Sequence, residues 1–161
     1  LNNIIAVAMS DAVLIADMSR AQDVKKAVDE LKANEVRQAT ISLKDHRPWG
    51  WFERIAIGER FQVKRIQVNP GASLSLQSHK HRSEHWIVVS GRARVTIDDK
   101  IQIISENESV FVPLLAVHRI SNPGTDPVVL IEVQSGDYLG EDDIIRYEDV
   151  YARGSPKKID Y

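Results

Sequence analysis

The sequence predicts a mainly β protein built as an antiparallel sandwich or barrel. From residue 51 onward, short runs rich in β-branched and aromatic residues follow one another, Gly, Pro, Asn and Asp mark turns between them, and no helical pattern interrupts the series. Regular short strands of this kind are typical of all-β folds. The expected strands are 51–57, 61–68, 73–79, 85–97, 101–104, 110–113, 117–121 and 127–134, and residues 144–151 could add a last short strand or helix.

The first 34 residues have a different character. Residues 4–9 and 12–16 are apolar runs separated by polar residues, which predicts a strand pair. Ser19, followed three residues later by a glutamine, has the pattern of a capping box, and the apolar spacing after it predicts a helix up to about Asn34. Two strands and one helix are too few for a domain. We expect an appendage or the end of a preceding domain, joined by a polar linker at 35–47.

Composition excludes several classes of function. The 161 residues carry a net charge of -2 with scattered basic residues, so nucleic-acid binding is not expected. Without cysteine there is no disulfide, thiolate metal site or cysteine nucleophile. No apolar stretch approaches the length of a membrane span and the start lacks a basic leader, so we expect no membrane association and a cytoplasmic location.

Histidine and carboxylate side chains gather in two short segments. His79 and His81 are two residues apart, so on an extended strand they would face the same side and could hold one ion. Glu84 offers an oxygen ligand and His118 a further nitrogen, which predicts a divalent metal (Zn, Mn, Co, Ni or Fe) at these four residues. Gln77 shares the predicted face, either as a further oxygen ligand or as a donor that orients a substrate.

These residues resemble the two cupin motifs. In the first motif, His79 lies two residues farther from the preceding glycine than is usual, and the gap from His81 to Glu84 is one or two residues short. Glu84 is preferred as the third ligand, with His85 as the alternative. The second motif is matched through Pro113, His118 and Asn122, while Asn107 and Leu115 replace its glycines. We expect the bulky Leu115 to alter the pocket mouth. The residues that fill the first motif are Gly71, His79, His81, Glu84 and Gly91.

A closer resemblance covers about residues 45–153. Segments 47–50, 63–66, 74–77, 81–91, 132–136 and 138–144 are similar to type II mannose-6-phosphate isomerase. That family is the C-terminal cupin domain (an RmlC-like jelly roll) of bifunctional mannose-1-phosphate guanylyltransferase/mannose-6-phosphate isomerase. The resemblance implies a cupin domain at 47–153, a guanylyltransferase remnant with linker at 1–46 and a tail at 154–161. The guanylyltransferase domain would be a partner on the parent chain, and this fragment is not expected to transfer guanylyl groups.

The resemblance also implies a mechanism. Isomerisation moves a proton between C2 and C1 of the open-chain sugar, which requires an electrophile, a base and a cationic phosphate anchor. The metal would act as electrophile, and His85 or Glu132 as base. Arg65 is expected to face the cavity and Lys80 to point away from it. The candidates for binding phosphate are Lys64, Arg65, Arg82 and Arg119.

Two other functions compete with the isomerase. One is a non-catalytic cupin that binds sugar phosphate or mediates dimerisation of the guanylyltransferase, and a weaker one is a metal-dependent oxygenase. We also expect a homodimer, because open sheet edges and apolar outer faces favour association of two copies of the chain. The residues that suggest such a face are Leu74, Leu76, Ile87 and Val89.

Overall fold

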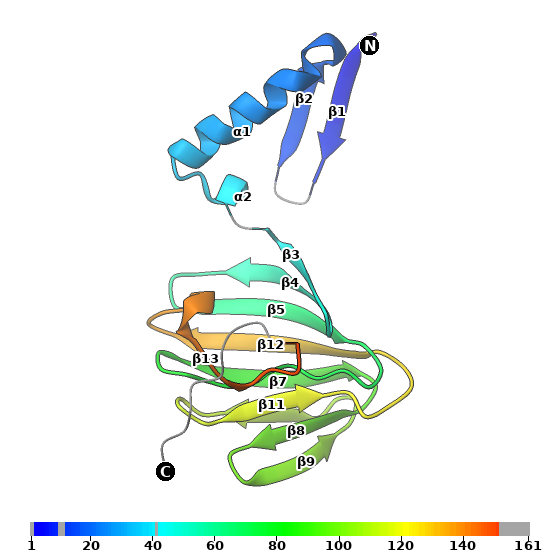
Figure 1. Cartoon of the computed structure of the whole chain (residues 1–161), viewed down its shortest axis with the longest axis vertical. Coiled ribbons are helices and arrows are strands. Elements are labelled where there is room, and N and C mark those ends of the chain that lie inside the picture. Colours follow the sequence, from blue (N-terminus) through cyan, green and yellow to red (C-terminus); the bar gives the residue numbers. More distant parts are fainter. Residues whose placement is uncertain (1, 10–11, 41, 152–161) are drawn as a thin grey trace. The chain divides into compact units, whose positions relative to one another are not determined.

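The computed structural model describes residues 2–9, 12–40 and 42–151, so the expected tail at 154–161 lies outside the described residues. The chain divides between Ser42 and Leu43 into two compact units. Each unit can be followed in Figure 1, in which the first is coloured blue to cyan and the second cyan to red. None of the helices in the described part of the chain is both long and apolar enough to cross a membrane.

The first unit contains the expected strand pair and helix. Its elements are β1 (Ile4–Ala8), β2 (Val13–Asp17), η1 (Met18–Asp23), α1 (Val24–Ala33) and α2 (Arg37–Thr40), with β1 antiparallel to β2. The cap differs from the expected one. Asp17 precedes the first helical turn and accepts hydrogen bonds from Ser19 N and Oγ at 2.8 and 2.7 Å. Ser19 is therefore inside that turn and donates hydrogen bonds to Asp17, which is the capping residue in its place.

The predicted linker at 35–47 is partly ordered into regular structure. Its first half contains α2, and its last four residues form β3 (Lys44–Arg47). Strand β3 pairs antiparallel with β4 (Gly50–Ile57), so that Asp45 lies opposite Phe52. The second unit therefore begins a few residues earlier than the sequence suggested, because a polar strand at a sheet edge has no apolar alternation to reveal it.

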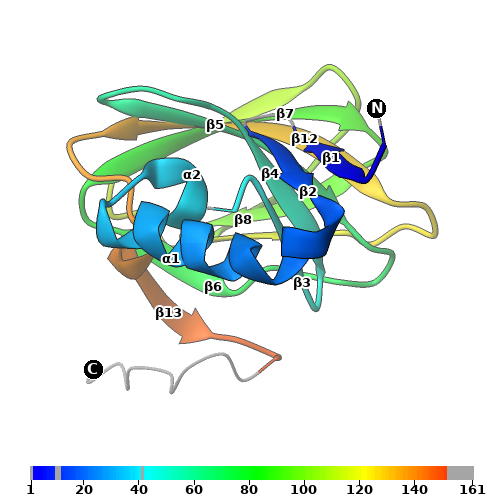
Figure 2. The same ribbon diagram turned by 90° about the horizontal axis from the view of Figure 1, so that it is seen from above.

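The second unit is an antiparallel barrel of two sheets, which confirms the predicted fold class. The sheets have six strands in the order β10-β7-β12-β5-β4-β3 and five strands in the order β13-β6-β11-β8-β9. Figure 2 shows β5, β12 and β7 on one side of the barrel and β6 and β13 on the other. The remaining bounds are β5 (Phe61–Val68), β6 (Leu76–His79), β7 (Arg82–Ser90), β8 (Ala93–Ile97), β9 (Lys100–Ile104), β10 (Ser109–Val112), β11 (His118–Ser121), β12 (Val128–Gly136), η2 (Glu141–Asp143) and β13 (Ile144–Glu148).

The inner face of the larger sheet is divided along its strands. One half is apolar, and it packs with residues such as Val95 and Ile120 of the smaller sheet into the core. In the other half, the side chains that point inward are mostly polar, and they are buried too. Such groups cost free energy unless they find partners or a ligand, so this half is where a site is expected. Residues that lie opposite one another on neighbouring strands form a rung of the sheet. The apolar rungs across β5, β12 and β7 are Val68–Val128 and Ile66–Leu130–Val88, and the polar rungs are Lys64–Glu132–Trp86 and Gln62–Gln134–Glu84.

Both residues that replace motif glycines have left-handed backbone conformations. Asn107 has φ 66° and Leu115 has φ 68°. Asparagine tolerates this region, whereas a leucine there is strained by about 1–2 kcal/mol. Leu115 is 61% exposed, and it is absent from the described residues that line the cavity beside Glu84 in the polar half of the barrel. The expectation that Leu115 changes the pocket mouth is therefore not supported by its position.

Candidate metal centre

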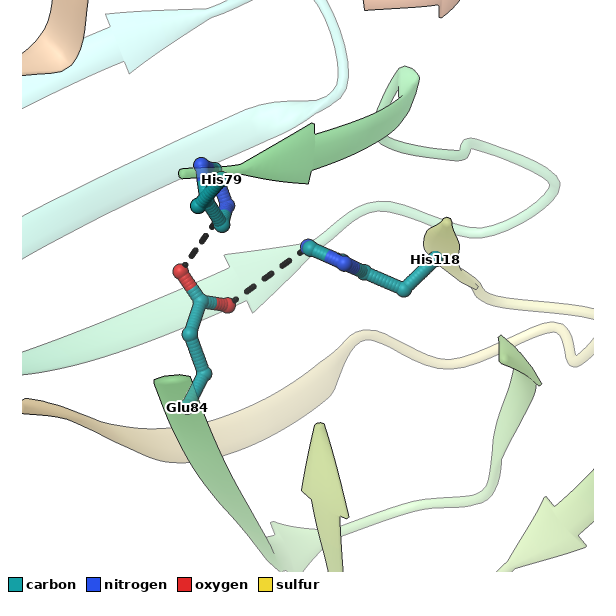
Figure 3. Close-up of side chains that lie close together, drawn as sticks. All are labelled: His79, Glu84 and His118. Atoms are coloured by element: carbon teal, nitrogen blue, oxygen red, sulfur yellow. Dashed lines mark ion pairs between the residues drawn. The ribbon is translucent and has the colours of Figure 1, made fainter. Parts of the chain in front are cut away.

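Three buried side chains from three strands converge in the polar half of the barrel. His79 ends β6, Glu84 lies near the start of β7, and His118 begins β11. His79 Nε2 lies 3.1 Å from Glu84 Oε1, and His118 Nε2 lies 3.8 Å from Glu84 Oε2 (Figure 3). One ligand atom of each residue lies within 4.8 Å of the others, so this group could hold a metal ion.

The two histidine rings are available for a ligand. Among the described residues, neither ring nitrogen of His79 has a hydrogen-bond partner, although Nε2 lies 3.1 Å from Glu84 Oε1. The His118 Nδ1–H can donate to Ala116 O at 2.9 Å, which leaves Nε2 with its lone pair and without a partner in the described part of the chain. Burial lowers the pKa of His118 and favours this neutral form. Neutral imidazoles with a fixed tautomer are the form that binds metal.

Glu84 is an ionised carboxylate in this cluster. Burial alone would raise the pKa of Glu84, but His79, His118 and Arg82 together hold it well below its usual value. Arg82 Nε lies 3.3 Å from Glu84 Oε1, and this arginine is itself almost completely buried. A carboxylate and two imidazoles form a mixed oxygen and nitrogen donor set suited to divalent transition metals.

His81 lies outside the cluster, which corrects the predicted shared face with His79. Strand β6 ends at His79, so the two-residue alternation does not extend to His81. The chain turns here, and Asp143 Oδ1 accepts hydrogen bonds from Lys80 N at 3.1 Å and contacts His81 Nδ1 at 2.8 Å. The His81 side chain is 54% exposed and faces Asp143 rather than Glu84.

Gln77 occupies the position that the motif assigns to its first histidine. It lies directly opposite His118 in the β6–β11 pair and two residues before His79, so all three share the inner face. With Gln77 and His79 in the two histidine positions, both intervals of the first motif become regular. Five residues then separate Gly71 from Gln77, and four separate His79 from Glu84. Gln77 Oε1 accepts a hydrogen bond from Ser75 Oγ at 2.8 Å, and Gln77 lines the cavity beside Glu84.

Glu132 also projects into the barrel, as its alternation suggested. Its Oε1 accepts a hydrogen bond from Trp86 Nε1 at 3.2 Å, and its Oε2 accepts one from Gln134 Nε2 at 2.9 Å. Burial and the nearby negative charge of Glu84 raise the pKa of Glu132 to about 8. A carboxyl group with a pKa near neutrality can exchange protons at physiological pH.

His85 is on the opposite side of the sheet from these groups. In β7, residues 82, 84, 86 and 88 are buried, so His85 alternates outward and is exposed. Its ring packs against Phe111 with a centroid separation of 4.6 Å. The structure thus places His85 away from the cavity, both as a base and as the alternative ligand to Glu84.

Two of the predicted phosphate-binding cations line the cavity and two face outward. Lys64 and Arg82 are buried among its walls. Arg65 alternates to the outer face and pairs with Glu53 at 2.7 Å, because β5 turns residues 62, 64, 66 and 68 inward. Arg119 pairs with Glu148 at 2.8 Å on the outer face of β11, and Lys80 is exposed as expected. Two cavity cations that the sequence reasoning missed are Arg47 and Arg146.

The segment that contains η2 forms part of the wall of the cavity beside Glu84, through Glu141. The volume of the cavity is about 50 Å³. Glu141 Oε1 lies 2.7 Å from Lys64 Nζ and 3.7 Å from Arg54 Nη2. Arg82 Nη1 donates to Gly140 O at 2.8 Å, so three cations attach the η2 segment to the barrel. Lys64 and Arg82 hold the pKa of Glu141 below its usual value although burial alone would raise it.

Sequence reasoning also missed three polar residues that organise the site. Gln134 and Gln62 are buried on the inner face of β12 and β5, and Asp143 fixes the turn after His79. The glutamines could have been found from alternation alone, because Gln134 is two residues after Glu132 and Gln62 two before Lys64. Asp143 gave no such signal, since its partners are more than sixty residues away.

A family comparison agrees with this geometry. Residues 34–149 match the family model described as mannose-6-phosphate isomerase C-terminal. The chain belongs to this family. The match covers every residue of the His79, Glu84 and His118 cluster, together with Glu132 and the cations that line the cavity.

Longer relatives share about half of the sequence. The chain is 54% identical over 153 residues to xanthan biosynthesis protein XanB of Xanthomonas campestris pv. campestris (strain B100), covering 95% of this chain and 33% of the relative. It is 51% identical over 151 residues to mannose-1-phosphate guanylyltransferase ManC of Salmonella typhimurium, covering 94% of this chain and 32% of the relative. The chain therefore spans about a third of the length of these relatives.

Solved structures agree on the fold. An RmlC-like cupin from Shewanella frigidimarina aligns with a TM-score of 0.55 at 23% identity, covering 65% of this chain and 90% of that one. This likeness shows that the barrel has the cupin fold. The buried histidines and carboxylate in its polar half could bind a metal.

Proposed function

We propose that the barrel unit is a metal-dependent isomerase that interconverts mannose 6-phosphate and fructose 6-phosphate in the cytoplasm. The observation that carries the proposal is the buried cluster of His79, Glu84 and His118, whose imidazole Nε2 atoms lack hydrogen-bond partners among the described residues. The match to the mannose-6-phosphate isomerase C-terminal family supports mannose 6-phosphate as the substrate. A buried carboxyl group, Glu132, and a buried lysine, Lys64, lie in the adjacent rung.

His79, Glu84 and His118 would hold the divalent metal, with Gln77 as a fourth ligand on the same inner face. When bound, the metal supplies positive charge that stabilises negative charge developing on the substrate oxygens. Glu132 is the base that removes the C–H proton from one sugar carbon and returns it to the neighbouring carbon. Trp86 and Gln134 hold this carboxyl group in place through hydrogen bonds.

Lys64 is the favoured anchor for the phosphate. The cavity, of about 50 Å³, has room for about one or two water molecules, far less than a small-ligand site requires. A sugar phosphate that enters it would therefore displace the Glu141 side chain, which lines it. The Lys64–Glu141 ion pair would open, and the phosphate would take the place of the Glu141 carboxylate on Lys64, with Arg82 nearby.

The test is a coupled assay for fructose 6-phosphate formation by this chain, after metal removal by a chelator and after addition of single divalent metals. We expect turnover with metal, none after chelation, and recovery when metal is restored, because all proposed groups lie within residues 64–132. Elemental analysis would identify the bound metal. Binding of metal and mannose 6-phosphate without turnover, in this chain and in a parent protein, would decide for the non-catalytic binding module.

We also propose that the chain is the C-terminal part of a longer protein in GDP-mannose and polysaccharide biosynthesis, with a guanylyltransferase domain before it. The support is that XanB and ManC are about three times as long and that ManC is named a guanylyltransferase. Adding that domain as a separate chain should not be needed for isomerase turnover. A requirement for it would place part of the site across domains.

The expected homodimer would use the outer face of the larger sheet. Ile87, Val89 and Phe111 are exposed there on β7 and on the edge strand β10, whereas Leu74 and Leu76 are partly buried and contribute less than expected. An exposed apolar face beside an open edge favours pairing with a second copy. Light scattering at tens of micromolar should give twice the mass of one chain, and Val89→Lys should give the monomer. A monomeric wild-type protein would contradict this.

A further inference from the structure

One buried amide lies between the two carboxylates of the site. Gln134 Nε2 donates a hydrogen bond to Glu84 Oε1 and another to Glu132 Oε2, each at 2.9 Å. The side chain is 1% exposed. It therefore connects the carboxylate of the metal cluster with the proposed base, and both of its N–H groups are used in doing so.

The neighbours of the amide favour this orientation. A rotated Gln134 would place its oxygen against the ionised Glu84 carboxylate, which has no proton to donate. Gln62 Nε2 donates to Gln134 Oε1 at 2.9 Å, which adds a second reason for the same orientation. The strand register creates this line, since Gln62, Gln134 and Glu84 lie opposite one another across β5, β12 and β7.

We propose that Gln134 is a positioning residue that fixes Glu84 for metal binding and Glu132 for proton transfer, and that Gln62 acts through it. The inference rests on the proposed metal site. Glu84 Oε1 receives the Gln134 hydrogen bond, while Glu84 Oε2 accepts one from Trp86 Nε1 at 3.1 Å. Both carboxylate oxygens are thus oriented by the protein, so less conformational entropy is lost when a metal binds.

The first experiment replaces Gln134 by Met, which keeps the length of the side chain and removes both donors. Metal-free protein is titrated with Co²⁺ by calorimetry, and the visible absorption of the Co²⁺ complex is recorded. We expect Kd to rise about 10- to 100-fold, as for other residues that orient metal ligands, and the absorption bands to change. Gln67→Met, on the outer face of β5, is the matched control and should change Kd less than twofold.

The second experiment tests whether Gln62 acts through Gln134. Gln62→Met should weaken Co²⁺ binding by less than Gln134→Met does. The double variant should bind as weakly as Gln134→Met alone, because the effect of Gln62 is lost once its partner is gone. Fully multiplicative effects on Kd would overturn this part of the inference. Gln62→Met also provides a test should Gln134→Met fail to fold.

The kinetic constants of Gln134→Met distinguish a residue that positions catalytic groups from one that only stabilises the fold. In Gln134→Met at saturating metal, kcat should fall while the KM for mannose 6-phosphate changes little, because Gln134 contacts the proposed base and not the phosphate anchor. Unchanged Kd, unchanged Co²⁺ bands and unchanged kcat in a folded variant would overturn the proposal and leave the isomerase standing. Metal binding by a wild-type chain that does not isomerise would disprove the function, and the Co²⁺ titration would still test Gln134.

Discussion

Replacing His79 by Ala is expected to remove bound metal and to lower isomerase activity by about a thousandfold or more. His79 is buried in the cluster with Glu84 and His118, and its ring nitrogens have no hydrogen-bond partner in the described part of the chain. A bound metal contributes several kcal/mol to stabilisation of developing charge, and each 1.4 kcal/mol is a factor of about ten in rate. Metal content is measured by elemental analysis and activity by the coupled assay.

Two other histidines provide matched controls for His79→Ala. His85→Ala changes a ring that packs on Phe111 at the outer face, and His81→Ala changes a ring that faces Asp143 in the turn after β6. Both variants should keep metal at the wild-type stoichiometry. Loss of metal from His81→Ala, together with full metal in His79→Ala, would show that the first-motif ligand is His81 and would contradict the assignment.

Glu132→Gln is expected to lower kcat by about 10²- to 10⁴-fold while metal binding and the fold are retained. This is the usual range for loss of a general base, and glutamine preserves the size of the side chain but cannot accept the proton. Its amide oxygen can still accept one of the two hydrogen bonds that Trp86 and Gln134 donate to Glu132. Glu53→Gln, which changes an outward carboxylate paired with Arg65, is the control and should have wild-type kcat. Wild-type turnover in Glu132→Gln would exclude Glu132 as the base.

The same variant has an expected signature in the stability of the metal-free protein. The pKa of Glu132 is raised from 4.5 to about 8 in the folded state, mainly by burial. Between these values the unfolded chain has released the proton and the folded protein retains it, so the Glu132 contribution to stability is complete below about 4.5 and is lost as pH rises towards 8. Denaturant unfolding should show Glu132→Gln gaining stability relative to wild type across this interval. A constant difference would contradict the raised pKa.

The strand series and much of the site could be predicted from the sequence. In β7 and β12 the alternation of apolar and polar residues marks the inward positions, and it places Glu84 and Glu132 on the inner face. His118 was identified because the second motif keeps its spacing. Asn107 and Leu115 were identified as replacements for glycine, and both adopt the left-handed conformation that a glycine would take at those turns.

The errors occurred where a local pattern was extended past the end of a strand or was read in the wrong phase. His81 was grouped with His79 because alternation was continued beyond β6, and Arg65 was turned inward although Lys64 shares the face of Ile66. The position at which β6 ends is set by the Asp143 carboxylate, which binds the backbone of Lys80 and His81 from a distant part of the chain. No pattern within residues 75–85 contains that information.

By itself the sequence determined the antiparallel β architecture, the separate N-terminal strand pair and helix, and the ligand types at His79, Glu84 and His118. These follow from local periodicity and motif spacing, which are properties of neighbouring residues. Only the tertiary structure decided that strand β6 ends before His81, that Asp143 binds His81 away from the cluster, and that Gln134 joins Glu84 with Glu132. The Gln134–Glu84 and Asp143–His81 contacts connect residues 50 and 62 positions apart. The geometry of the Gln134 contact depends on strand register, because a shift of one residue reverses the face of every side chain.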